Sequence, residues 1–213
     1  MSAMLRAHTP YSTKITWSRD VSRIVYRNCA SCHRQGGSSF SLMTYRDARP
    51  WAEALKQQVL ERRMPPWNAV KGFGEFKNDR GLTQEDLEVI AEWVDGGEPE
   101  GNPMHMPPVP EFKSDAAETR LHLHPGERAL TFRGTTSLKH SLKAIGIRAD
   151  SIPDQGLRAV ARRPNGAIEP LIWIEKFNPD DKRTYYFRHS LRLPAGTSIE
   201  IEPPESSIAL VVK

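Results

Sequence analysis

Both cysteines of the 213-residue chain lie in one pentapeptide, Cys-Ala-Ser-Cys-His, at residues 29 to 33. Thiols at Cys29 and Cys32 can add to the vinyl groups of haem as thioethers, and His33 can then bind the iron from one face. A disulfide, a redox dithiol or half of a zinc site would use the same cysteine pair. A zinc site needs further Cys or His ligands, and none is suitably spaced. The pentapeptide therefore predicts one covalently attached haem c.

Met64 is our candidate for the second axial ligand of the iron. It stands between an expected helix and a Pro-Pro turn that could hold the thioether still. Methionine ligation favours reduced iron and raises the reduction potential, which suits electron transfer. The alternative is that Met64 only fills a core. The competing ligands are Met43, Met104, Met106 and His105, and an open sixth position is a further option.

A second metal site is conceivable in the C-terminal half. His122 and His124 are two residues apart, so on a strand both would point to the same face. Together with His140 or His189 they could bind copper. The sequence shows no carboxylate or sulfur ligand to complete such a site. We therefore interpret these histidines as part of a solvent-exposed strand face and do not expect copper.

Composition and missing motifs exclude several classes of function. The net charge is +4 and the pI about 9.1, but no basic run exceeds two residues and no aromatic–basic platform is present. We therefore expect no nucleic-acid partner. No apolar run approaches the roughly 20 residues of a membrane-spanning helix. There is also no nucleophile elbow, phosphate-binding glycine loop or HExxH motif.

Apolar periodicity predicts helices in the first half of the chain. One covers residues 17–29 and ends at the pentapeptide. A second covers residues 45–63, with Pro50 in its first turn. A third begins at Thr83, where Asp86 completes a capping-box-like start, and ends at Gly96-Gly97.

A proline-rich stretch divides the chain. Five prolines fall between residues 98 and 112, which predicts a stiff, extended connector. We expect an N-terminal extension (1–15), a mostly α-helical haem domain (16–98), a linker (99–118) and a β domain (119–213).

Short strand-like runs separated by Pro, Gly, Asn and Asp turns follow the linker. This pattern predicts an antiparallel β-sandwich. With the helical first half, it predicts an α+β multidomain protein. The expected runs are residues 121–124, 142–149, 157–161, 171–174, 183–193, 198–201 and 208–212.

The first half resembles a bacterial single-haem cytochrome c domain of the kind often fused to other modules. The resemblance covers about residues 16–110 and includes the Cys-Ala-Ser-Cys-His-Arg, Arg-Arg-Met-Pro-Pro-Trp and Trp-Val-Asp-Gly-Gly segments, together with Ser-Leu-Met-Thr-Tyr-Arg-Asp-Ala-Arg-Pro-Trp. It implies that Met64 is the distal haem ligand. It also implies that Trp51, Trp67 and Trp93 are pocket and packing residues rather than electron relays.

The second half resembles a C-terminal domain of copper type II ascorbate-dependent monooxygenases, which implies a jelly-roll sandwich. The resemblance is carried by Arg-Pro-Asn-Gly-Ala-Ile-Glu-Pro-Leu, Tyr-Tyr-Phe and Leu-Arg-Leu-Pro-Ala-Gly-Thr-Ser-Ile-Glu-Ile. The copper site of that family needs a His-x-His pair and a downstream methionine. Here His140-Ser141-Leu142 keeps one histidine, and no methionine follows Met106. This departure argues against monooxygenase chemistry.

These features together predict an electron carrier or electron-transfer subunit rather than an enzyme, with the β domain as a docking or scaffold module. The alternatives are a haem-fed, copper monooxygenase-like enzyme that binds copper at His122/His124 or His140, and a haem sensor with an open sixth site. We expect redox partner proteins, with a larger respiratory or photosynthetic complex as one setting. Residues 1–20 lack the apolar core of a signal peptide, so we expect a periplasmic protein whose signal or anchor lies outside this sequence.

Overall fold

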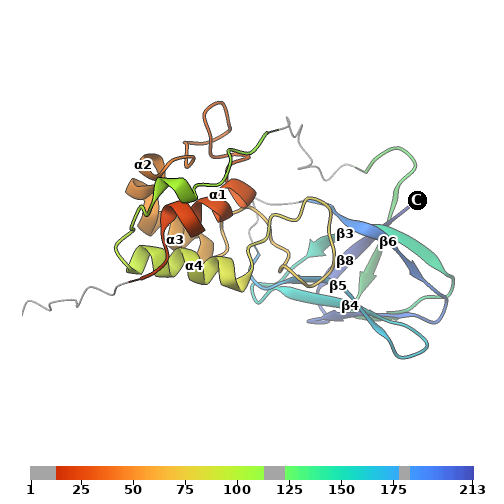
Figure 1. Cartoon of the computed structure of the whole chain (residues 1–213). Coiled ribbons are helices and arrows are strands. Elements are labelled where there is room, and N and C mark those ends of the chain that lie inside the picture. The colour runs from red at the N-terminus through yellow and green to blue at the C-terminus, as the bar shows by residue number, and fades with distance from the viewer. Residues whose placement is uncertain (1–12, 113–122, 178–182) are drawn as a thin grey trace, which may run out of the picture. The chain divides into compact units, whose positions relative to one another are not determined.

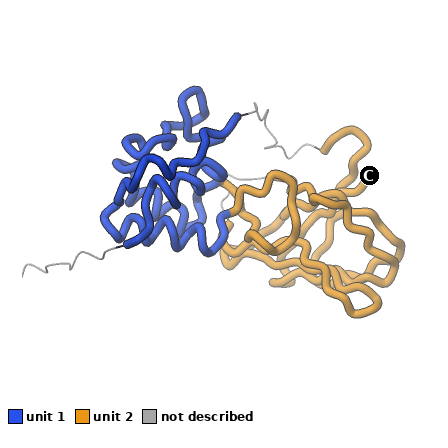
Figure 2. Tube along the Cα trace, viewed as in Figure 1, with its two compact units in different colours: residues 1–65, 82–113 blue, residues 66–81, 114–213 orange. Residues whose placement is uncertain are grey.

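A computed structural model describes residues 13–112, 123–177 and 183–213 (Figure 1). The chain divides into two compact units (Figure 2). Unit 1 comprises Met1–Pro65 and Leu82–Lys113 and is mainly helical. Unit 2 comprises Pro66–Gly81 and Ser114–Lys213 and is built on strands. The predicted α+β class is confirmed.

Unit 1 contains the helices that the sequence predicts, with one interrupted. The expected helix over residues 45–63 is divided into three short pieces, because Pro50 has no backbone N–H to continue the ladder. The first expected helix begins with a π-helical turn. The elements are η1 (Trp17–Val21), α1 (Ser22–Asn28), α2 (Tyr45–Ala48), η2 (Arg49–Trp51), α3 (Ala52–Leu60), α4 (Gln84–Asp95) and η3 (Pro103–His105).

The predicted capping box of α4 is present. The Asp86 backbone N–H donates to the Thr83 hydroxyl at 3.0 Å, and the Thr83 N–H donates to the Asp86 carboxylate at 2.9 Å. The buried face of α4 carries Trp93, whose ring centroid lies 5.8 Å from that of Trp17. Because η1 and α4 pack through these rings, the helix that leads to the pentapeptide has a fixed place in unit 1.

The proline-rich stretch does not form a free connector over residues 99–112. The backbone N–H groups of Trp17 and Ser18 donate to the carbonyls of Pro99 and Glu100, both at 2.9 Å. Met106 packs against the core of unit 1. Residues 113–118 of the expected linker lie outside the described residues. The prolines therefore restrict the backbone while the segment stays hydrogen-bonded to unit 1.

Unit 2 holds two four-stranded antiparallel sheets, with strand orders β1-β8-β3-β6 and β2-β7-β4-β5. The pairing is nested, since β4 pairs with β5, β3 with β6, β2 with β7 and β1 with β8. Buried side chains from both sheets belong to one hydrophobic cluster. The strands are β1 (Arg128–Arg133), β2 (Thr135–Ser137), β3 (Leu142–Ser151), β4 (Leu157–Arg162), β5 (Ile168–Ile174), β6 (Tyr185–Leu193), β7 (Ser198–Glu202) and β8 (Ser207–Val212).

Six of the seven expected runs coincide with β3 to β8. Most of the run at 121–124 lies outside the described residues, and residues 123 and 124 are not in a strand. The sequence pattern did not predict β1 and β2, which both lie at a sheet edge and have largely exposed residues. No residue of β1 or β2 is fully buried, so their hydrophobic alternation is weak.

Residues 66–81 form part of unit 2, although the predicted boundaries assign them to the haem domain at 16–98. The Val70 N–H donates to the Trp173 carbonyl at 2.7 Å, and the Lys77 N–H donates to the Tyr186 carbonyl at 2.8 Å. Trp67, Ala69 and Phe76 belong to the core of unit 2. The apolar side chains of this segment enter that core. Their partners there are far away in the sequence, so the local sequence pattern does not predict this packing.

No helix in the described part of the chain is both long and apolar enough to cross a membrane.

Candidate functional site

The end of α1 positions the two cysteines and the histidine. Cys29 caps the helix, and its N–H donates to the Val25 carbonyl at 2.8 Å. The N–H groups of Cys32 and His33 then donate to the Cys29 carbonyl at 3.1 and 2.9 Å. One tight turn therefore presents both thiols and the imidazole together. The two cysteines do not form a disulfide; Cys29 is buried and Cys32 is partly exposed.

The environment of Cys29 does not suit a reactive thiol. Burial raises the pKa of Cys29 to about 12, with smaller contributions from the neighbouring Cys32 and the Asp86 carboxylate. Redox-active cysteines depend on a lowered pKa and an accessible thiolate. The structure thus gives no support to the redox-dithiol alternative at this position.

His33 is held in an orientation that suits a metal ligand. Its ring Nδ1 lies 3.0 Å from the Phe40 carbonyl oxygen, so a protonated Nδ1 donates there and leaves the Nε2 lone pair for a metal. The loop that carries Phe40 is fixed in turn. The Leu42 N–H donates to the His33 carbonyl at 3.1 Å, and the Ser39 N–H donates to the Cys32 carbonyl at 3.2 Å.

Apolar side chains gather beside His33. The Phe40 ring meets the imidazole edge-on at 4.8 Å and stacks on Trp51 at 4.4 Å. Phe40 and Trp51 are both 46% exposed, although large apolar side chains are usually buried. A flat, mostly apolar porphyrin would cover such rings, so these residues fit a haem bound at the pentapeptide.

The end of α3 positions the backbone of Met64. Arg62 adopts a left-handed conformation with φ 55°, and the Arg63 N–H donates to the Gln58 carbonyl at 2.9 Å, as in a Schellman motif. The Met64 N–H donates to the same carbonyl at 3.2 Å. The Met64 side chain is 40% exposed, which does not agree with the core-filler alternative.

The competing ligands lie in different environments. Met104 is 87% exposed on η3 and Met106 is packed against the core of unit 1. Met43 is half-buried, and its carbonyl accepts from the Tyr26 hydroxyl at 3.1 Å. His105 is exposed on η3, and its carbonyl accepts a hydrogen bond from Arg23.

The three tryptophans expected to be pocket and packing residues lie in different surroundings. Trp51 lies beside Phe40, and Trp93 is fully buried in the core of unit 1. Trp67 packs in the core of unit 2, outside the helical unit that contains Trp51 and Trp93. Its place in the Met-Pro-Pro-Trp segment gave no sign of this, because only tertiary packing decides which core it enters.

The copper candidates do not converge on a site in the described residues. His122 lies outside them, and the His124 ring lies 5.7 Å from that of Tyr186. His140 and His189 are exposed. Within residues 13–112, 123–177 and 183–213, no group of three or more His, Cys, Asp or Glu side chains could hold a metal ion.

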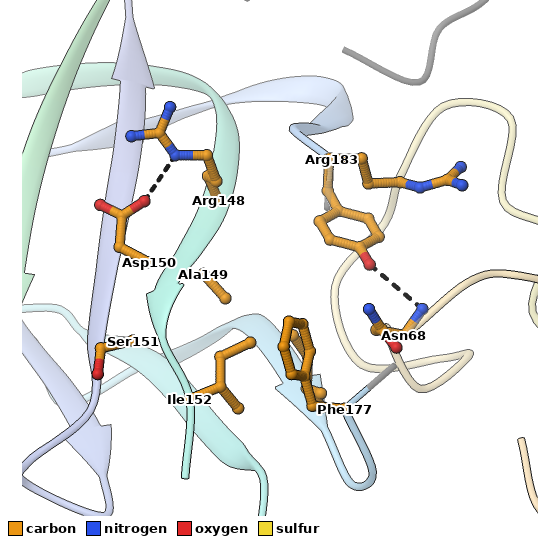
Figure 3. A pocket seen from close by; sticks show the side chains of 10 residues that line it. Asn68, Arg148, Ala149, Asp150, Ser151, Ile152, Phe177 and Arg183 are labelled. Carbon is orange, nitrogen blue, oxygen red and sulfur yellow. Dashed lines mark hydrogen bonds and ion pairs between the residues drawn. The ribbon is translucent and has the colours of Figure 1, made fainter. Parts of the chain in front are cut away.

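Unit 2 also contains a cavity of about 620 Å³ that no sequence motif predicts (Figure 3). An ion pair, Arg148 to Asp150 at 2.6 Å, lines it. Asn68, Arg183 and Tyr185 also line it, and the Asn68 backbone N–H donates to the Tyr185 hydroxyl at 3.2 Å. These residues come from segments far apart in sequence, so no local motif marks the cavity.

Comparison of the chain with protein-family models and with curated proteins finds no match.

Proposed function

We propose that this protein is a c-type cytochrome that carries one haem and transfers electrons. In this proposal Cys29 and Cys32 form the thioethers, and His33 and Met64 bind the iron. The observation that carries it is the geometry at the end of α1. There the pentapeptide forms one turn and the Phe40 carbonyl orients the imidazole of His33, with exposed aromatic rings alongside.

Each residue has a definite task in this proposal. Bound haem would supply one-electron exchange between ferric and ferrous iron. The hydrogen bond from Nδ1 of His33 to the Phe40 carbonyl fixes the tautomer and leaves Nε2 to bind the iron. Phe40 and Trp51 would shield a bound haem from water, and the thioether of Met64 would favour the reduced state.

We further propose that unit 2 is a jelly-roll sandwich that serves as a docking or scaffold module for redox partners in the periplasm. The nested pairing of eight strands supports the topology. A long antiparallel ribbon, folded over so that its strand pairs alternate between two sheets, gives the strand orders observed here. The shared hydrophobic cluster of the two sheets supports their packing face to face.

The test is expression together with a haem-maturation system. We expect haem-stained peroxidase activity to stay with the polypeptide on a denaturing gel, with one iron per chain. Replacing both thiols (Cys29→Ser with Cys32→Ser) should remove the covalent haem, because each thioether needs a sulfur. A wild-type chain that runs without haem stain would refute the proposal.

Metal analysis of the same sample separates the carrier from the enzyme alternative. Iron without copper supports electron transfer by the haem alone. Stoichiometric copper would instead support the monooxygenase-like alternative with His122/His124 or His140 as ligands.

A further inference from the structure

We infer that the Asp86 carboxylate, held at the start of α4 next to the helix that ends at Cys29, lowers the reduction potential of the haem. The inference rests on the proposed function and deepens it, since it gives a role to a buried charge that is neither an attachment site nor an iron ligand. In this role Asp86 favours ferric iron, so its effect opposes that of the Met64 thioether.

The first observation is that Asp86 is buried inside unit 1. The residue is 7% exposed, although aspartate is seldom fully buried unless it is paired. Its neighbour Leu87 belongs to the same hydrophobic cluster as Cys29. Apolar surroundings screen a charge less than water does, so the electric field of this carboxylate extends further than that of a surface acid.

The second observation is that both oxygens of the carboxylate are held. The Thr83 backbone N–H donates to Oδ2 at 2.9 Å, and the Arg27 guanidinium donates to Oδ1 at 2.5 Å. Hydrogen bonds between charged partners are stronger than neutral ones and restrict the geometry more. The carboxylate therefore has a fixed position relative to α1.

The third observation is that this position lies near the attachment turn. Arg27 is in the last turn of α1, two residues before Cys29. The Asp86 carboxylate also contributes to the raised pKa of the Cys29 thiol, which shows that its field extends to that sulfur. In the proposed holoprotein the same sulfur is bonded to the porphyrin. A negative charge that acts at Cys29 therefore acts on the haem as well.

Arg27 offsets only part of the negative charge. Its side chain is 58% exposed, whereas that of Asp86 is 10% exposed. Water screens the exposed guanidinium more strongly than the buried carboxylate, so the pair acts as a net negative charge at the attachment turn. Ferric haem carries one more positive charge than ferrous haem. A negative field therefore favours the oxidised state and lowers the potential.

The test is a redox titration of the full-length holoprotein and four variants. Asp86→Asn removes the charge but keeps an oxygen that can accept from the Thr83 N–H. Arg27→Gln removes the opposite charge of the same pair. Two controls lie in the same part of α4: Glu85→Gln removes an exposed acid from its first turn, and Thr83→Ala breaks the cap without a change of charge.

We expect Asp86→Asn to shift the equilibrium with a fixed-potential mediator towards ferrous iron by a factor on the order of ten, from Coulomb's law with an effective dielectric constant of about 20. Arg27→Gln should shift it towards ferric iron by a smaller factor, because the carboxylate loses its counter-charge. Loss of the pair as a structural contact would move both variants in the same direction. Glu85→Gln and Thr83→Ala should stay within about twofold of wild type.

The second readout is the weak charge-transfer band of methionine-ligated ferric haem. It should persist in all four variants, because none of them changes an iron ligand. Loss of the band in Asp86→Asn would overturn the inference, since a change of ligand would then explain the shift in potential.

The inference is also overturned if Asp86→Asn leaves the potential unchanged, or if Arg27→Gln shifts it in the same direction as Asp86→Asn. If Asp86→Asn does not fold, Arg27→Gln decides alone: a shift towards ferric iron supports the inference, and any other result overturns it. In these cases the haem is attached and the cytochrome proposal survives. A wild-type chain without covalent haem refutes the cytochrome proposal, and the inference with it.

Discussion

At the scale of single residues, the proposed haem site has separate residues for attaching the cofactor and for setting its reduction potential. Cys29, Cys32 and His33 share one turn after α1, so their relative positions are fixed by local backbone hydrogen bonds. Met64 comes from the end of a different helix, and its side chain is exposed. We therefore expect changes at the cysteines to abolish cofactor attachment, and changes at Met64 to alter the properties of an attached cofactor.

Met64→Ala should lower the reduction potential by an amount on the order of 0.1 V, because loss of the thioether removes a ligand that favours ferrous iron. Protein-film voltammetry measures this shift, and the charge-transfer band should vanish. Met104→Ala is the matched control, since Met104 is 87% exposed on η3. An unchanged potential in Met64→Ala would point to another ligand.

The buried thiol of Cys29 predicts a pH effect in protein prepared without haem. Burial raises its pKa to about 12, so the folded state favours the protonated thiol. The resulting stability is fully present below the unfolded-state pKa of about 8.5, and is lost as the pH rises towards 12. Urea unfolding at about pH 8 and about pH 11 should show this loss in the parent chain.

The same loss should be smaller in Cys29→Ser, which has no thiol to ionise at that position. Equal alkaline destabilisation of both chains would contradict this assignment.

At the scale of elements, the ends of helices position residues of the proposed haem site and of its support. The Schellman-type end of α3 orients Met64, and the capping box of α4 orients Asp86. Asp86 also pairs with Arg27 on α1 at 2.5 Å. The start of α4 is thereby tied to the helix that ends at the pentapeptide, so the capping of one helix supports the position of another.

Thr83→Ala should destabilise the protein by about 1 kcal/mol, since the first turn of α4 loses its side-chain acceptor. Chemical denaturation followed by circular dichroism measures the change. Gln84→Ala alters the next residue, which is exposed and is not part of the capping box, and should change stability by less than about 0.5 kcal/mol. Equal effects of the two substitutions would argue against the capping role.

At the scale of the whole molecule, the two units are interleaved along the chain. Unit 2 takes residues 66–81 from between α3 and α4 of unit 1. Because Trp67 and Phe76 lie in the core of unit 2, a fragment that begins at residue 119 would lack part of that core. The predicted boundary at 119 therefore does not define an independently complete unit.

Cleavage within residues 113–122, at an inserted protease site, should yield two fragments that stay together on gel filtration. Residues 66–81 of the first fragment remain in the core formed by the second. The fragments should separate in denaturant. Trp67→Ala combined with Phe76→Ala should weaken their association, while Trp51→Ala, in unit 1, should not. Separation of the unmodified fragments in native buffer would contradict this arrangement.

Local sequence by itself determined the features that depend on neighbours along the chain. The capping box of α4 and the helix before the pentapeptide were predictable because hydrogen bonds within a few residues define them. Six of the strands in unit 2 were predictable from their apolar runs and turns. The Cys-Ala-Ser-Cys-His motif likewise predicts covalent haem attachment from five consecutive residues.

Only the tertiary structure decided which core each aromatic side chain enters. Trp51 and Trp67 both stand in the first half of the chain, yet Trp51 lies beside Phe40 and Trp67 lies in unit 2. The edge strands β1 and β2 and the hydrogen bond from Arg183 to Pro66 also depend on partners more than 60 residues away. Burial and long-range hydrogen bonding are properties of the folded chain, so a local pattern cannot specify them.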